Sequence, residues 1–174
     1  MRRSHRSIRE KDYDEISVTE ILKRANVGRS TFYMHFASKE ELLLSSMHGM
    51  LRSVSAIPAP ASAKRHENIV QFSLPILEHV VEHRAQGAAM GPGGRAVLHK
   101  HLQNALSGMI ADDVRRELKG RRKTAGQASP ELLAKFIAST FVLVLNWWLQ
   151  SESRMSPKEI DAIFRALVLP TLAK

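Results

Sequence analysis

Residues 17–43 read SVTEILKRANVGRSTFYMHFASKEELL, and this stretch decides the fold. Its first part predicts a short amphipathic helix, because one helix face collects the small and apolar residues Val18, Ile21, Leu22 and Ala25. Asn26-Val27-Gly28 then predicts a sharp turn, since Asn tolerates left-handed dihedral angles and Gly suits a helix N-cap. A second helix is expected over residues 29–36. This order of elements is typical of a helix-turn-helix.

The second helix of this unit has one apolar and one polar face. Phe32 and Phe36 lie four residues apart, and we expect both to be buried. The opposite face then presents Arg29, Ser30, Thr31, Tyr33, Met34 and His35. Hydroxyls and a cation in this arrangement suit the major groove of DNA and its flanking phosphates. Lys39 begins the next helix, where we expect its ammonium and the helix N-terminus to meet a phosphate.

Extended by one residue, the stretch Ile16 to Leu43 resembles the signature of the tetracycline-repressor (TetR-like) family of regulators. The matching pattern is TFYMHF, from Thr31 to Phe36, followed by SKEEL, from Ser38 to Leu42. The resemblance implies an all-α fold. An N-terminal helix-turn-helix head is then followed by a larger helical domain that binds a small ligand and dimerises.

Carried onto this chain, the resemblance implies DNA-contact roles for particular residues. The positions that usually contact phosphates are Thr31, Tyr33, His35 and Lys39. Those that often face bases are Arg29, Ser30 and Met34, and the preceding helix meets the DNA backbone at Ser17 and Thr19. The implied function is a ligand-responsive transcriptional repressor that binds a two-fold operator in double-stranded DNA as a homodimer.

The segment upstream of this signature is shorter than the family pattern. A full first helix of several turns usually precedes the Tyr13–Val18 segment, but here Met1–Lys11 supplies only Ile8 as a large apolar residue after Met1. We therefore expect a shortened first helix with few core contacts. An alternative function follows from this, namely a dimeric protein-interaction regulator with impaired DNA binding.

Proline and glycine predict the boundaries between the helices. Pro58 and Pro60 interrupt residues 56–63, because proline lacks an amide donor and restricts the residue before it. We expect a linker here, between a DNA-binding domain of residues 1–55 and a ligand-binding and dimerisation domain of residues 64–174. Four glycines and a proline predict a helix–helix connection at residues 87–94, and residues 120–127 are expected to form an exposed loop.

Helix starts follow a repeated pattern. Three serines are each followed three residues later by a glutamate, as in a capping box, and the pairs are Ser17 with Glu20, Ser38 with Glu41, and Ser156 with Glu159. Ser129-Pro130 predicts a similar start, since proline fits the first helical position.

The last two predicted helices are apolar enough to form an interface. Residues 132–149 are apolar on nearly every face, so this helix must be covered on all sides. With the final helix, residues 158–169, it predicts half of a four-helix interface between two copies. The interface residues we expect are Leu132, Phe136, Leu143, Trp147, Ile160, Ile163, Phe164 and Leu167. The alternative is that both helices are buried within one subunit.

A small-molecule effector is expected among the middle helices. The candidate pocket residues are Phe72, Leu77, Met90, Leu98, Leu102, Met109 and Trp148. Leu and Met at helical spacing are more often ordinary core residues, which is the alternative for each of them.

Residues 79–83 read HVVEH and match the inverted zinc-peptidase pattern. His79 and His83 share a helix face and, with Glu82 as general base, would serve a metal hydrolase. The alternative is an amphipathic helix with its polar side outward, and a third ligand is not evident. We therefore expect no catalytic site, no metal and no cofactor.

Composition sets the broad class. The chain has 174 residues, 44% of them hydrophobic, and no cysteine, which predicts a globular protein in a reducing compartment such as the cytoplasm. The net charge of +9 favours a polyanionic partner, although only part of it lies in the helix-turn-helix region. The longest apolar run, residues 136–149, falls short of the roughly 20 residues of a membrane span, and no secretory signal is visible.

Overall fold

The computed structural model describes residues 13–57, 65–83, 91–119, 128–151 and 153–172, and all regular secondary structure in these ranges is helical. The predicted all-α fold, with a helix-turn-helix head before a larger helical body, is confirmed. The elements in chain order are the 3-10 helix η1 (Tyr13–Glu15) and the α-helices α1 (Val18–Ala25), α2 (Arg29–His35), α3 (Lys39–Ser55), α4 (Arg65–Asn68), α5 (Ser73–Glu82), α7 (Gly91–Leu118), α8 (Pro130–Gln150) and α9 (Pro157–Leu172).

Several predicted helix starts are confirmed by side-chain hydrogen bonds. The Glu20 amide donates to Ser17 Oγ over 3.2 Å, and the Ser17 amide donates to the Glu20 carboxylate over 2.9 Å. The Ser156 box has the same two bonds, and the Ser156 amide holds the pKa of Glu159 below its usual value. Ser129 also caps α8, with Pro130 in its first turn.

At α3 only half of the predicted box is present. Ser38 Oγ accepts from the Glu41 amide over 3.2 Å, as expected. The Glu41 carboxylate, however, accepts from the Ala37 amide, over 2.6 Å, one residue before the cap. The amides of Glu41 and Ala37 therefore both have an acceptor, so α3 starts stably although Ser38 and Glu41 do not bond to each other in both directions.

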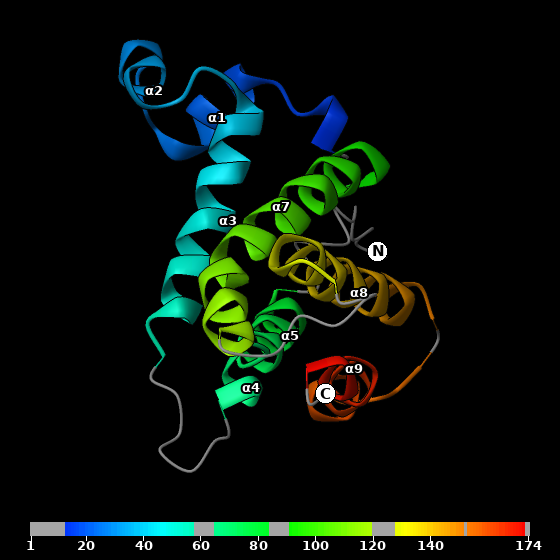
Figure 1. Ribbon diagram of the computed structural model, residues 1–174. Coiled ribbons are helices and arrows are strands. Elements are labelled where there is room, and N and C mark those ends of the chain that lie inside the picture. Colours follow the sequence, from blue (N-terminus) through cyan, green and yellow to red (C-terminus); the bar gives the residue numbers. More distant parts are fainter. Residues whose placement is uncertain (1–12, 58–64, 84–90, 120–127, 152, 173–174) are drawn as a thin grey trace, which may run out of the picture.

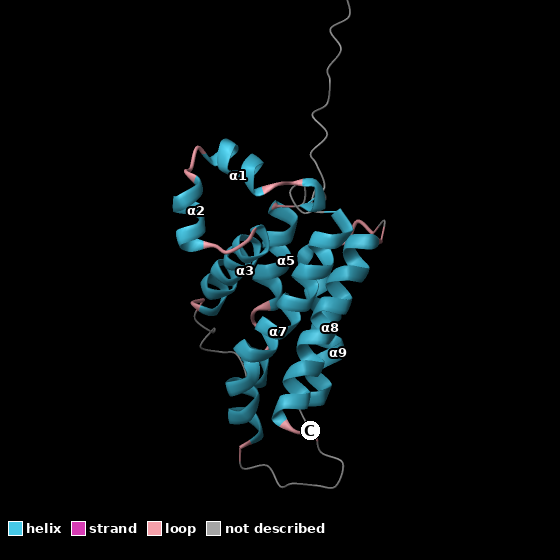
Figure 2. Ribbon diagram, turned by 90° about the horizontal axis from the view of Figure 1, so that it is seen from above, coloured by secondary structure: helices cyan, strands magenta, loops and turns pink. Residues whose placement is uncertain are grey.

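The body is built around the long helices α7 and α8. α7 and α8 pack along each other, and α9 lies against α8 and α5. Figure 2 shows α8 and α9 side by side. Phe72, Phe141 and Phe164 meet at the centre of the core with ring centroids 5.2 to 6.0 Å apart. Each such aromatic pair contributes about 0.5–1.5 kcal/mol beyond its buried area.

A buried polar group also ties α5 to α9. The Ser73 hydroxyl donates to the Asp161 carboxylate, whose other oxygen accepts from Arg165 Nε over 2.7 Å. Arg165 donates further to the carbonyl oxygen of Val70. Because each partner is hydrogen-bonded, the buried charge is compensated and the two helices keep one register.

α3 connects the head to the body. Its first turns lie beside α1 and α2, which project from one end of the molecule in Figure 1. Its later turns bury Met47, Leu51 and Val54 in the core of the body, against α5 and α7. α3 therefore spans the junction between the head and the body. The helix ends at Ser55, and most of the predicted 56–63 linker lies outside the described residues.

One predicted boundary is wrong in part. α7 begins at Gly91, so residues 91–94 are helical and the connection predicted for 87–94 does not extend to its end. Proline is tolerated here because Pro92 lies in the first turn, where amide groups have no partner within the helix. Residues 87–90, the predicted 120–127 loop and the predicted first helix at 1–11 lie outside the described residues.

α8 is the helix, among the described residues, with the length and apolar composition of a membrane span. Leu133, Ile137, Phe141, Val144 and Trp148 are buried along one side of it, within the core shared with α7 and α9. This is the packing of a core helix, as predicted.

Candidate functional site

The turn between α1 and α2 has the predicted geometry. Asn26 adopts a left-handed conformation, with φ of 52° and ψ of 45°, and Gly28 is the N-cap of α2. The Val27 amide closes the turn by donating to the Leu22 carbonyl oxygen over 3.1 Å. The Val27 side chain is exposed, so the backbone of the turn, and not this side chain, sets the angle between the helices.

α2 presents its polar face to solvent at the free end of the head. Phe32 is buried, and it packs edge-on against Tyr33 and at 5.7 Å from Phe36, which is half-buried. The predicted DNA-contact residues of this helix are all exposed, and they are Arg29, Ser30, Thr31, Tyr33, Met34 and His35. The guanidinium of Arg29 lies 5.9 Å from the centre of the Tyr33 ring. This contact holds a cation and a phenol together on one face.

Two of the predicted DNA-contact residues, Ser17 and Thr19, precede α2 in the chain. Thr19 is exposed on α1. Ser17 is exposed too, but its hydroxyl is engaged in the capping box with Glu20. The Ser17 hydroxyl therefore already has a structural role, which is to start α1, in addition to its predicted contact with DNA.

Lys39 does not extend toward solvent as predicted. Its ammonium donates to the carbonyl oxygens of Tyr13, Asp14 and Ile16 over 2.7, 3.2 and 3.0 Å. It also lies 4.6 Å from the centre of the Tyr13 ring. An ammonium has three donors, and all are used inside the head. In the structure Lys39 holds η1 against the start of α3, and its predicted contact with phosphate stays a prediction.

η1 in turn contacts the body. Asp14 lies so close to Gly93, near the start of α7, that a Cβ atom on Gly93 would overlap the Asp14 carboxylate. Nearby, His101 of α7 lies 3.8 Å from the carboxylate of Glu40 on α3. Burial, followed by the charges of Glu40 and Asp14, raises the pKa of Tyr13 above its usual value. The head is thus joined to α7 as well as through α3.

A cavity of about 720 Å³ lies between α3, α5, α7 and α8. Its size is in the range of small-molecule sites. It is lined by Leu43, Ser46, Met47 and Met50 of α3, Ile76, His79, Val80 and His83 of α5, Arg95, Leu98, His99 and Leu102 of α7, and Leu145, Asn146, Leu149 and Gln150 of α8. The helix that carries the head therefore forms one wall of the cavity.

Two imidazoles in the cavity, those of His79 and His99, have lowered pKa values. Burial lowers the pKa of His99, against the opposing effect of its 3.1 Å contact with the amide of Asn146. Burial, followed by the neighbouring His83, also lowers the pKa of His79. Arg95 places a guanidinium in the cavity lining.

The cavity includes some of the predicted pocket residues. Leu98 and Leu102 line it. Phe72, Leu77 and Trp148 do not, because they are packed in the core of the body. Met109 lies in a separate shallow depression beside α3, and Met90 lies outside the described residues. The lining residues of α3 were not predicted, since residues 39–55 show no sign in the sequence that a gap lies beside them.

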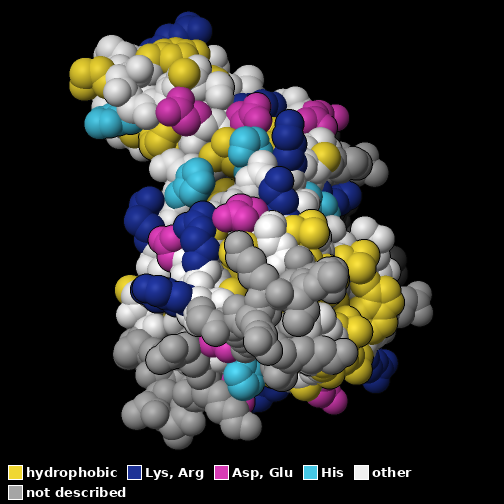
Figure 3. All heavy atoms as spheres, viewed as in Figure 1, with side chains coloured by type: hydrophobic (Ala, Val, Ile, Leu, Met, Phe, Trp, Pro, Cys, Tyr) yellow, Lys and Arg dark blue, Asp and Glu magenta, His cyan; other side chains and the backbone are white. Residues whose placement is uncertain are grey.

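The predicted interface face is partly free. Leu132, Phe136, Leu143, Trp147 and Leu167 are exposed, and Figure 3 shows hydrophobic side chains gathered on the flank where α8 lies. Ile163 is partly buried. Ile160 and Phe164 are fully buried within the chain's own core, so their prediction as interface residues is wrong. They face α5 and α8, which helical periodicity by itself does not reveal.

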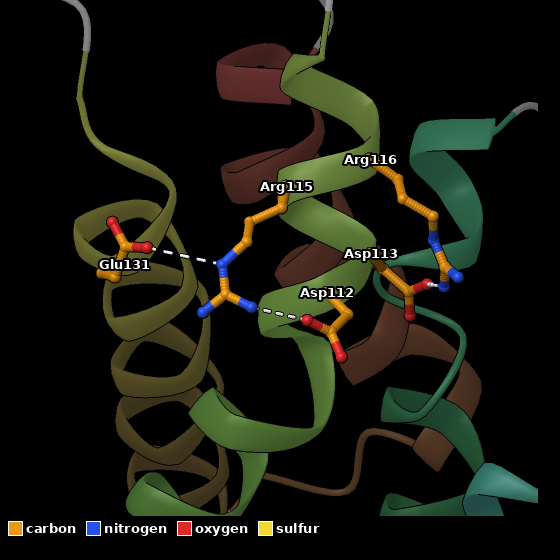
Figure 4. A network of polar contacts seen from close by, with 5 residues as sticks. All are labelled: Asp112, Asp113, Arg115, Arg116 and Glu131. Atoms are coloured by element: carbon orange, nitrogen blue, oxygen red, sulfur yellow. Dashed lines mark hydrogen bonds and ion pairs between the residues drawn. The ribbon is translucent and has the colours of Figure 1, made fainter.

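Two arginines near the end of α7, Arg115 and Arg116, are paired with carboxylates. Arg115 donates to Asp112 over 2.5 Å and to Glu131 of α8 over 3.4 Å, and Arg116 pairs with Asp113 (Figure 4). These pairs are exposed, so each contributes little to stability.

Comparison with known proteins finds family models that match both the head and the body of the chain. The family model described as bacterial regulatory proteins, tetR family, matches residues 1–45, and the model described as transcriptional regulator C-terminal region matches residues 67–169. The chain belongs to the TetR family of transcriptional regulators. No curated protein matches the chain.

A solved structure shares the TetR-family fold. It is a TetR transcriptional regulator from Streptococcus agalactiae, 24% identical, and the match covers 92% of this chain and 85% of that one with a TM-score of 0.55. At this identity the likeness concerns the fold. The DNA-binding role rests on the helix-turn-helix domain, which the family model matches.

Membership of the TetR family, which is non-enzymatic, makes the metal-hydrolase alternative wrong. The His79 and His83 rings are stacked, with centroids 4.1 Å apart and planes 28° from parallel. One ligand atom each of His79, Glu82 and His83 lie within 4.8 Å of one another, so the family, and not this geometry, decides against the hydrolase. His83 Nδ1 also lies 3.0 Å from the His79 carbonyl oxygen, as expected for a hydrogen bond within the last turn of α5.

Proposed function

We propose that this TetR-family regulator is a ligand-responsive repressor that acts in the cytoplasm as a homodimer on a two-fold operator. The division into a head of residues 1–55 and a body of residues 64–174 is part of this proposal. The observation that carries it is the position of α3, which lines the cavity with Met47 and Met50 and begins only a few residues after the end of α2.

The exposed α2 face supports the DNA-binding geometry. Arg29, Ser30 and Tyr33 lie together on it, and their donors suit base edges and phosphates. Thr31, Met34 and His35 extend the same surface. Because a single helix-turn-helix reads one half-site, two copies are needed to read two half-sites about 34 Å apart.

The exposed apolar residues of α8 and α9 support the homodimer. Leu143 and Leu167 are each more than half exposed, at 67% and 54%, and Trp147 lies one turn after Leu143. A contiguous apolar face of this kind is unusual on a monomer and marks an interaction site. A second copy would cover it with its own identical face, as two-fold symmetry requires.

The regulator responds to a ligand if the shape of the cavity differs between two arrangements of the two DNA-binding heads of the dimer. A ligand that fits one arrangement better shifts the population toward it, by as much as its affinities for the two differ. Here the ligand would press on Met47 and Met50, and α3 would carry the change to α2. Contacts of η1 with Gly93 give α7 a second route to the head.

The test measures DNA binding and mass together. Fluorescence anisotropy with a duplex from the region upstream of the gene should show binding that weakens with salt, because lysine and arginine release counterions from phosphates. Light scattering after size exclusion should give twice the mass of one chain. A monomer, or an absence of salt-dependent DNA binding, would contradict the proposal.

A further inference from the structure

Polar side chains gather at one end of the cavity. α7 and α8 run antiparallel, since the start of α7 contacts the end of α8 through His99 and Asn146, 3.1 Å apart. The last turn of α5 lines the cavity beside them. The polar lining residues of these three helix ends are His79, His83, Arg95, His99, Asn146 and Gln150. Apart from Ser46, the other lining residues are apolar, so the cavity is amphipathic.

The polar end favours negative charge. In the described parts of the chain, no aspartate or glutamate lines the cavity. Arg95 is exposed and has no carboxylate partner among the residues that the structure describes. A cationic ligand would therefore meet an uncompensated guanidinium, whereas a carboxylate would accept two parallel hydrogen bonds from it.

His99 adds a neutral donor to this end. Its Nδ1 lies 3.1 Å from the Asn146 amide nitrogen, so Nε2 is the ring nitrogen that can hydrogen-bond a ligand. The lowered pKa of His99 keeps this imidazole uncharged near neutral pH. A hydrogen bond to a carboxylate is stronger than one between neutral groups, so the same donor serves an anion better than an alcohol.

We propose that the effector is an amphipathic carboxylate, with its acid group at Arg95 and His99 and its apolar body between α3, α5 and α8. This inference rests on the proposed function of the cavity as the effector site. It goes further by stating the charge and the orientation of the ligand. Met47 and Met50 of α3 would then contact the apolar body, so chain length would govern the effect on the head.

The test uses three probes that differ only in their head group. Decanoate, decanol and decyltrimethylammonium are titrated into the full-length protein by calorimetry, below their micelle concentrations. Decanoate should bind about tenfold or more tightly than decanol, because a charge-assisted hydrogen bond contributes about 1.5–3 kcal/mol. Decyltrimethylammonium should not bind.

Substitutions distinguish binding at this site from nonspecific binding to the protein. Arg95→Gln should weaken decanoate binding about tenfold and leave decanol unchanged. Arg116→Gln, which removes an exposed arginine outside the cavity, should change neither. His99→Gln provides a second variant at the polar end and should also weaken decanoate selectively. Thermal unfolding followed by circular dichroism checks that each variant is folded.

The outcomes distinguish this inference from the proposed function. Equal binding of decanoate and decyltrimethylammonium, or equal losses for decanoate and decanol in Arg95→Gln, would overturn the carboxylate inference. Failure of all three probes to bind to a protein that still binds its operator would also overturn the carboxylate inference. Decanoate binding by a protein that fails to bind DNA would leave the ligand class intact and contradict the repressor instead.

Discussion

The ammonium of Lys39 lies 2.7 Å from the backbone carbonyl oxygen of Tyr13 and 4.6 Å from the centre of the Tyr13 ring. The TetR-like pattern suggests that a lysine at this position meets a DNA phosphate. In this chain the same lysine joins η1 to α3, and η1 rests on α7 at Gly93. The residue therefore acts within the junction between head and body.

Lys39→Met tests this role, since it keeps the length of the side chain and removes the ammonium. The free energy of unfolding in urea should fall by about 1–3 kcal/mol, because three backbone carbonyls lose a charged donor. A plot of DNA affinity against salt should run parallel to that of the natural protein. A slope smaller by about 0.9 would instead indicate a lost phosphate contact and contradict the assignment.

Gly93→Ala tests the contact between η1 and α7. Alanine in a helix interior normally stabilises by about 0.5–1 kcal/mol relative to glycine. Here the gain should be smaller than that, because the exposed Asp14 carboxylate must move aside to admit the new Cβ. Gly108→Ala is the matched control in the same helix, where a Cβ meets nothing within 4 Å, and it should stabilise.

A double substitution completes that experiment. Asp14→Ala removes the obstructing carboxylate, so Asp14→Ala combined with Gly93→Ala should recover stability beyond the sum of the single effects. The expected interaction energy is of order 0.5–3 kcal/mol. Strict additivity of the two changes would show that the residues are not in contact.

Leu143→Asp tests the interface. The residue is 67% exposed in one chain, so the substitution leaves the fold of the subunit unharmed but places charges at the centre of the proposed dimer. Light scattering should show half the mass of the natural protein, and operator affinity should fall at least about tenfold, since each monomer reads one half-site. Val81→Asp, at another exposed apolar residue, is the control and should remain dimeric.

His99 predicts a pH dependence of stability. Its pKa in the folded protein is lowered by burial, so below about pH 6.5 the unfolded chain takes up a proton more readily than the folded one. The stability contributed by neutral His99 is complete above that pH and is lost as the pH falls toward the folded pKa. The melting temperature should therefore drop less between pH 7.5 and pH 5.5 in His99→Gln than in the natural protein. Equal drops would contradict the burial of a neutral imidazole.

Local features could be predicted from the sequence because they depend on neighbouring residues. Ser17 with Glu20 and the left-handed Asn26 are examples, since their partners lie within a few positions along the chain. Lys39 could not, because its partners lie 23 to 26 residues away and are backbone oxygens without a sequence signal.

Helical periodicity showed which faces are apolar but not what covers them. Phe164 and Leu167 both lie on apolar sides of α9, yet the first is buried against the chain's own core and the second is exposed. The cavity lining has the same limitation. Met47 lines a gap and Leu77 does not, although both are apolar helical residues, since this depends on how the helices pack together.

The central claim is that the exposed face of α2 binds DNA. It is tested most directly by the operator affinity of Arg29→Ala, measured by fluorescence anisotropy beside Arg116→Ala, which removes an equal charge from the body. Arg29→Ala should lose about 1–3 kcal/mol of binding free energy, or roughly fivefold to more than a hundredfold in affinity, and Arg116→Ala almost none. Equal affinities of the two variants would contradict this claim.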